Sequence, residues 1–181
     1  MPRTEIALLR GINVGKAKRI AMADLKKLVE NLGYGEVRTL LNSGNVVFTV
    51  PGSARGSSAA RIEEALASKF GVSARVTSIT AEELATAVEG NPIRAMDRDP
   101  SRALVAFLRK PEDRKLLQPL AKRRWAPEEL AIGKRVAYLW CPGGILESPL
   151  LEAVSRALGD GVTTRNWATV AKLCKIAEGE T

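Results

Sequence analysis

Two short segments near the start of the chain carry residue types that could hold an anion. They are residues 10–16 (RGINVGK) and 42–45 (NSGN), and each follows an apolar run typical of a buried strand. A glycine turn after a strand can present backbone amides, and a nearby cation adds positive charge. We expect Arg10 and Lys16 to supply positive charge. Directional hydrogen bonds would come from Asn13, Ser43 and Asn45. Gly11 and Gly44 would permit the backbone to approach the ligand closely.

The first segment has some features of a phosphate-binding loop but does not match its pattern. The Walker A motif has four residues between its glycines and a Ser or Thr after its lysine. Here three residues separate Gly11 from Gly15, and Ala17 follows Lys16. The sequence therefore does not favour a nucleoside triphosphatase.

The composition excludes several classes of site. The chain has no histidine and only two cysteines. Catalysis by Ser-His-Asp or Cys-His is therefore excluded, as is a zinc site with imidazole or multiple thiolate ligands. Cys141 and Cys174 form no CxxC pair, and we expect both thiols to be reduced and buried. We expect no metal and no cofactor.

The formal net charge of +8 indicates an anionic ligand or partner. Six cations gather in residues 10–27 and seven more in residues 109–124. These basic segments are compatible with nucleic acid binding and equally with a solvated face. No run reaches the roughly 18 apolar residues that a membrane span requires, and the first residues lack the order of a secretory signal. We expect a cytoplasmic protein without a membrane partner.

The candidate residues must be positioned by the strands and helices around them. Apolar periodicity and turn residues predict six elements in the first half: a strand at 4–10, a helix at 22–32, strands at 36–41 and 46–50, a helix at 57–70 and a strand at 72–76. This order is the split βαβ arrangement of ferredoxin-like folds. In that fold the first and third strands are antiparallel neighbours, so the end of the first, at Arg10, should lie beside the start of the third, at Asn45.

The second half repeats most of this order. The pattern predicts a linking helix at 81–89, a strand at 102–108, a helix at 111–121, strands near Leu130 and at 136–140, and helices at 149–158 and 165–177. The last strand of the ferredoxin-like order is missing from this prediction. We therefore expect an α+β fold with antiparallel sheets, built from two ferredoxin-like halves over residues 1–79 and 80–181, with an extra C-terminal helix.

The segment TTRNW at residues 163–167 is expected to open the final helix. A threonine there can cap the first amides of the helix. Arg165 and Asn166 would then lie at the positive end of the helix dipole, and we include both as candidate ligand-binding residues. A simple cap with solvated charges is the alternative.

Several of these segments resemble the domain of unknown function 1697 family of small bacterial proteins. The matching stretches are IALLRGINVGK, MADLKKLVENLG, VRTLLNSGNVVF, GNPI and TTRNWATVAKL, which extend from Ile6 to Leu173. The family often has a second threonine where this chain has Ala171. The resemblance implies an α+β fold of two ferredoxin-like halves and no established activity, cofactor or catalytic residue.

Three functions remain open from the sequence. The first hypothesis is a protein that binds a phosphate-bearing ligand, either nucleotide-like or nucleic acid, at the edge formed by the two turns. The second is an enzyme that acts on a small anionic substrate with Lys16 or Ser43 as its reactive group. The third is a protein interaction module whose basic faces only increase solubility.

Overall fold

The computed structural model describes residues 1–15 and 19–180 and contains two compact units. Unit 1 comprises Met1–Glu82 and Lys175–Thr181, and unit 2 comprises Glu83–Cys174. Residues 175–181, which the sequence pattern assigned to the second half, belong with unit 1.

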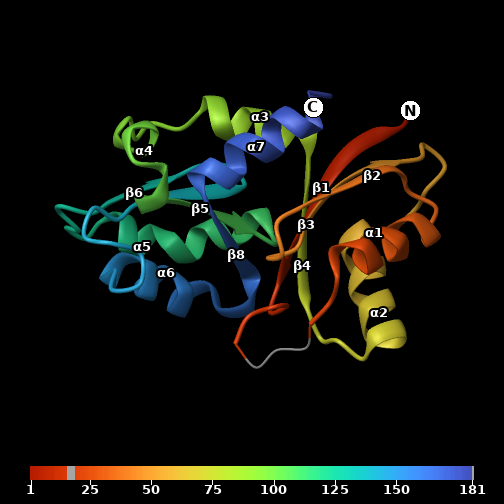
Figure 1. The fold of residues 1–181 in the computed structure, drawn as a ribbon. Helices are drawn as coiled ribbons and strands as arrows, with labels where there is room; N and C mark the ends of the chain where they lie inside the picture. Colours follow the sequence, from red (N-terminus) through yellow and green to blue (C-terminus); the bar gives the residue numbers. More distant parts are fainter. Residues whose placement is uncertain (16–18, 181) are drawn as a thin grey trace. The chain divides into compact units, whose positions relative to one another are not determined.

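Unit 1 has the βαββαβ order of a ferredoxin-like fold (Figure 1). Its sheet is antiparallel with the strand order β2-β3-β1-β4. The elements are β1 (Arg3–Arg10), α1 (Met22–Asn31), β2 (Gly35–Leu40), β3 (Asn45–Val50), α2 (Ser58–Phe70) and β4 (Arg75–Thr80). The predicted order of strands and helices is confirmed, whereas the last strand lies over 75–80 and not over 72–76.

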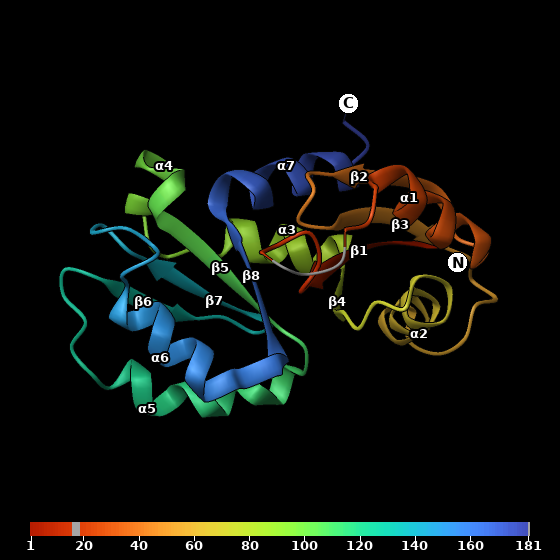
Figure 2. The ribbon, with the colours of Figure 1, turned by 60° about the horizontal axis from the view of Figure 1, so that its bottom comes forward.

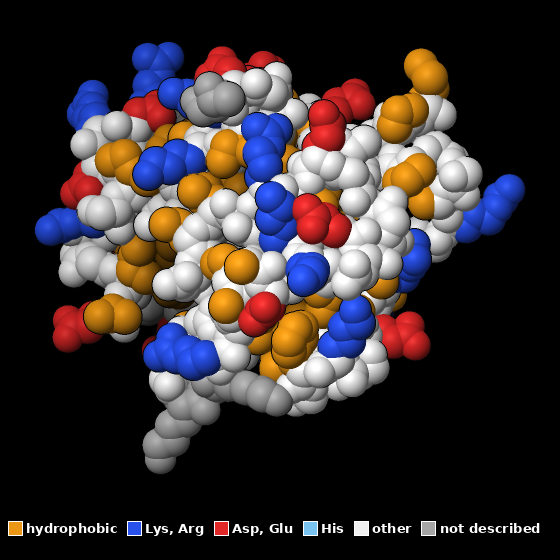
Figure 3. All heavy atoms as spheres, turned by 45° about the vertical axis from the view of Figure 1, so that its right-hand side comes forward, with side chains coloured by type: hydrophobic (Ala, Val, Ile, Leu, Met, Phe, Trp, Pro, Cys, Tyr) orange, Lys and Arg blue, Asp and Glu red, His pale blue; other side chains and the backbone are white. Residues whose placement is uncertain are grey.

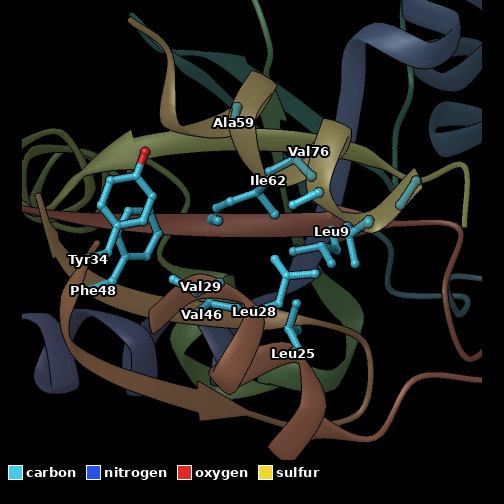
Figure 4. Close-up of a cluster of buried hydrophobic side chains, with 14 of the residues drawn as sticks. Leu9, Leu25, Leu28, Val29, Tyr34, Val46, Phe48, Ala59, Ile62 and Val76 are labelled. Atoms are coloured by element: carbon cyan, nitrogen blue, oxygen red, sulfur yellow. The ribbon is translucent and has the colours of Figure 1, made fainter. Parts of the chain in front are cut away.

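The helices α1 and α2 supply one face of the unit 1 core (Figure 4). Alternate residues of β1 and β3, such as Leu9 and Phe48, point into this core because successive strand side chains face opposite sides. Leu25 of α1 and Ile62 of α2 are fully buried against them. The ring of Tyr34 stacks on Phe48 with centroids 4.9 Å apart, which closes one end of the core.

Unit 2 repeats the same architecture with an antiparallel sheet of order β6-β7-β5-β8 (Figure 2). Its strands are β5 (Ala103–Leu108), β6 (Glu129–Ile132), β7 (Val136–Trp140) and β8 (Val162–Asn166). Its helices are α3 (Ala81–Glu89), α4 (Ala95–Arg98), η1 (Pro100–Arg102), η2 (Pro111–Leu117), α5 (Gln118–Ala121), α6 (Pro149–Leu158), η3 (Gly159–Gly161) and α7 (Trp167–Ala177). Of these, α3 and α7 cross the boundary between the units along the chain. Leu117 of η2 and Val154 of α6 pack with β5 and β7 in one core.

Two predictions for unit 2 were wrong. The ferredoxin-like order is complete, because residues 162–166 form β8 and pair with β5, with Thr164 opposite Ala106. Their β-branched side chains suit a strand once β5 supplies a partner. The helix expected over 111–121 is a 3₁₀ helix followed by the short α5, since Pro119 cannot donate the hydrogen bond that a continuous α-helix requires at that position.

Within the described part of the chain, no helix has both the length and the hydrophobicity needed to cross a membrane. The structure thus gives this protein no helical membrane span among those residues.

Candidate functional site

The two glycine-containing turns meet at one edge of the unit 1 sheet. The end of β1 lies beside the start of β3, as the split βαβ order predicts, although the residue opposite Asn45 is Leu8 and not Arg10. The amide of Leu9 donates a 2.8 Å hydrogen bond to the carbonyl of Gly44. We name the group of residues 10–15, 19–20, 42–45 and Arg75 the paired-turn edge.

Gly44 is the point of closest approach between the turns. Its φ of +89° lies in the region that favours glycine. A Cβ placed there would lie 2.8 Å from both the Cβ of Leu9 and the Cδ1 of Ile12. Gly44 therefore serves two purposes: it permits the turn, and it lets the hairpin pack directly on the chain that leaves β1.

Asn13 joins the first turn to its surroundings through three hydrogen bonds. Its Nδ2 donates to the carbonyl of Ile20 at 2.9 Å and to the carbonyl of Asn42 at 2.8 Å, while its Oδ1 accepts from the amide of Ile20 at 2.7 Å. Its φ of +52° is one that asparagine tolerates better than most residues. Both amide hydrogens are used within the protein, so Asn13 orders the edge and does not offer its amide group to a ligand.

Asn45 and Ser43 have a similar internal role. The side chain of Asn45 is fully buried, and its Nδ2 donates to the carbonyl of Leu40 at 2.7 Å and to the Oγ of Ser43 at 3.1 Å. These bonds close the hairpin between β2 and β3. Asn45 is thus a structural residue of the turn, and the Ser43 hydroxyl oxygen accepts one of its hydrogen bonds.

The positive charge at the edge comes from two neighbouring strands. Arg10, at the end of β1, lies opposite Arg75, at the start of β4, and both residues are exposed. Residues opposite one another in an antiparallel pair carry their side chains on the same face. Arg19 adds a third guanidinium, whose Nη1 donates to the carbonyl of Asn13 at 2.7 Å. The predicted residue Lys16 lies outside the described residues.

Helix α1 begins two residues after Ile20, at the same edge. Its N-cap position is Ala21, and no side chain that the structure describes caps the helix there. The first amides of a helix lack intrahelical partners, and the helix dipole places partial positive charge on them. The backbone adds to the positive potential at the paired-turn edge, while Asp24 in the first turn opposes it.

Arg165 and Asn166 belong to unit 2, at the end of β8. The Oδ1 of Asn166 accepts a 2.9 Å hydrogen bond from the amide of Thr169, so Asn166 caps α7 in the way that was expected of a threonine. The predicted start of the helix at Arg165 was wrong, since α7 begins at Trp167. Burial lowers the pKa of Arg165 to about 10, which leaves its guanidinium charged at neutral pH.

Sequence reasoning missed Arg75 and Arg19. The signal for Arg75 was present, because the split βαβ order places the start of the fourth strand beside the end of the first. The predicted strand at 72–76 put this residue inside the strand and not at its start. Arg19 is one of the cations of the basic segment 10–27, and its hydrogen bond to Asn13 cannot be inferred from residue spacing.

A hollow of about 510 Å³ lies elsewhere on unit 1, beside β2 and β3. Its described lining includes Thr4, Glu36, Arg38, Thr49 and Glu178 and none of the predicted site residues. Arg38 donates to the carbonyl of Ile176 at 2.9 Å, which ties the C-terminal residues to β2. No group of three or more His, Cys, Asp or Glu residues in the described chain could hold a metal ion.

The comparisons with known proteins support the fold. A family described as a protein of unknown function, DUF1697, matches residues 3–138. The chain belongs to the DUF1697 family. The matched residues include the whole paired-turn edge, whereas Arg165 and Asn166 lie beyond them.

Among solved structures, the DUF1697 chain is similar to the conserved bacterial protein SP0830 from Streptococcus pneumoniae. The TM-score is 0.74 at 22% sequence identity, with 98% of this chain and 99% of that chain covered. This likeness shows a shared fold over the whole length. No curated protein matches the chain.

Proposed function

We propose that unit 1 binds a compact phosphate-bearing ligand at the paired-turn edge. The observation that carries the proposal is the register of Arg10 opposite Arg75 where the two turns meet. Like charges opposite one another on adjacent strands repel, so an anion that approaches both is stabilised. A guanidinium suits phosphate because its planar array of donors matches two phosphate oxygens.

The turns support the proposal by holding the edge in one conformation. Asn13 binds both Ile20 and Asn42, and Asn45 closes the hairpin from within. An edge that is ordered before binding loses less conformational entropy when a ligand arrives. Asn13 and Asn45 therefore contribute to binding through order, while the guanidiniums of Arg10 and Arg75 contribute the contacts.

The size of the edge favours a nucleotide-like molecule or sugar phosphate over a nucleic acid polymer. The described cations gather at the ends of two adjacent strands, and adjacent strands lie about 4.8 Å apart. A single phosphate or diphosphate group can contact both cations. Each charge-assisted hydrogen bond contributes about 1.5–3 kcal/mol, so each arginine should change the affinity by about tenfold or more.

The test is a thermal-shift panel with pyrophosphate, ATP and glucose 6-phosphate, each at low and high salt. We expect at least one of these compounds to raise the melting temperature at both salt concentrations, because a ligand that binds the native state stabilises it. The variant Arg10→Gln/Arg75→Gln should lose the shift. The control Arg55→Gln/Lys69→Gln, which removes two exposed charges from unit 1 outside this edge, should keep it. No shift with any compound, or equal shifts in both variants, would refute the proposal.

A further inference from the structure

The basic segment of unit 2, residues 109–124, is a second positively charged surface. It contains seven cations and two carboxylates. Six of the cations are exposed: Lys110, Arg114, Lys115, Lys122, Arg123 and Arg124. On the face drawn in Figure 3, Lys and Arg side chains are interspersed with Asp and Glu. Within residues 109–124, cations outnumber carboxylates by seven to two, so the segment is strongly basic.

Most of these charges have no carboxylate partner. Within the part of the chain that the structure describes, no carboxylate lies within 4.0 Å of the charged groups of Lys110, Arg114, Lys115, Lys122 or Arg124. Two of these cations, Arg114 and Lys115, lie on η2, and the other three flank η2 and α5. Five cations without a carboxylate partner among the described residues, all within fifteen residues of the chain, create a local positive potential that attracts a polyanion.

An aromatic ring lies at the end of this segment. The guanidinium of Arg123 is stacked over the ring of Trp125, 4.5 Å from its centroid. The Nε1 of Trp125 donates to the carbonyl of Leu120 at 2.8 Å, which fixes the ring against α5. The half-buried indole and the guanidinium on its face together form a planar group next to the cations.

We propose that the basic segment of unit 2 binds single-stranded nucleic acid. Its cations would neutralise successive phosphates, and a base would stack at the Arg123–Trp125 pair. Proteins that bind single strands without sequence preference combine a positive surface with aromatic or guanidinium planes on which bases stack. An anionic membrane is less suitable, because the exposed large hydrophobic residue of the segment is Leu116 alone, and interfacial binding requires a wider apolar face.

The direct test is fluorescence anisotropy with a labelled oligonucleotide of about 20 nucleotides, longer than the sites of typical single-strand binding domains. We compare the variant Lys115→Gln/Lys122→Gln/Arg124→Gln with a control that removes three charges from unit 1, Lys27→Gln/Arg55→Gln/Lys69→Gln. Each neutralised phosphate contributes about 0.7 to the slope of log affinity against log salt. The first variant should lower that slope by about 2 and weaken binding about a hundredfold at about 0.1 M salt. The control should change both far less.

Stacking has a separate readout. Binding should quench tryptophan fluorescence in the unmodified protein, and Trp125→Phe should remove that quenching while the protein still unfolds cooperatively. Persistent quenching in Trp125→Phe would refute the stacking contact.

The proposal as a whole fails if the oligonucleotide does not bind, or if the two triple variants lose affinity equally, which would indicate a net-charge effect. It also fails if phosphatidylserine vesicles bind and the oligonucleotide does not. Arg10→Gln/Arg75→Gln should leave oligonucleotide binding intact, so this proposal and the one for unit 1 can fail independently.

Discussion

The substitution Gly44→Ala tests the contact between the two turns. Two costs are expected. The first is backbone strain, because a residue with a Cβ at φ +89° loses about 1–2 kcal/mol relative to glycine. The second is steric, because the new Cβ would lie 2.8 Å from the Cβ of Leu9, which cannot move without the backbone of β1. Forcing atoms into a packed site costs about 1–3 kcal/mol.

Gly33→Ala is the matched control. Gly33 also has a φ of +89°, but a Cβ there meets no described atom within 4 Å. It should therefore show the strain alone, about 1–2 kcal/mol, while Gly44→Ala should cost about 2–5 kcal/mol. The difference between the two variants measures the steric contact of the turns and not the preference of glycine for positive φ.

Hydrogen exchange followed by mass spectrometry is the suitable assay, because it reports the opening free energy of β1 and β3 peptides directly. Tryptophan fluorescence would not serve, since Trp125, Trp140 and Trp167 all belong to unit 2. If the two variants destabilise β1 within about 0.5 kcal/mol of each other, the close packing of the turns is refuted.

Three further predictions concern single side chains. Asn13→Ala removes three hydrogen bonds and should lower the opening free energy of β1 and β3 peptides by about 2–4 kcal/mol in hydrogen exchange; a loss below about 0.5 kcal/mol would contradict its bridging role. Asn166→Ala removes the cap of α7 and should cost about 1 kcal/mol in urea unfolding, whereas Asn166→Asp, which keeps the acceptor, should cost less. Burial raises the pKa of the Cys141 thiol from 9.0 to about 11, so between these values the native state holds a proton that the unfolded state releases. The contribution of the protonated thiol to the free energy of unfolding is therefore complete below pH 9 and is lost as the pH rises to about 11. In urea unfolding, the free energy of unfolding of the unmodified protein should fall more steeply over this pH range than that of Cys141→Ala. Equal slopes in the two proteins would refute the raised pKa.

The strand order and the meeting of the turns could be predicted because their signals are local. Apolar alternation in β1 and β3 and the glycine hairpin between β2 and β3 each specify a short element. The split βαβ order then fixes which strand ends are neighbours. That β1 and β3 are antiparallel neighbours follows from that order, but the register does not, since Asn45 pairs with Leu8 and not with Arg10.

The last strand of unit 2 could not be predicted in the same way. Residues 162–166 have no apolar alternation beyond Val162, and they lead directly into a helix. Their extended conformation depends on β5, which lies more than fifty residues earlier in the sequence. Long-range pairing of this kind overrides a local pattern that favours a helix start.

The chemistry of the asparagines was equally beyond the sequence. Residue type shows that Asn13 and Asn45 can form hydrogen bonds, but not whether the partners belong to the protein or to a ligand. In both cases the side-chain amide hydrogens bind other atoms of the protein. The candidate site therefore depends on Arg10, which was predicted, and on Arg75, which became apparent only from the exact start of β4.

The most direct test of anion binding at the paired-turn edge is a titration of the ¹⁵N-labelled protein with pyrophosphate, followed by two-dimensional NMR. The account predicts saturable shifts confined to the amides of residues 9–15, 20–24, 42–46 and 74–76, and their loss in Arg10→Gln/Arg75→Gln. If no residue of the paired-turn edge shifts, or if the shifts occur only in the basic segment of unit 2, the central claim is wrong.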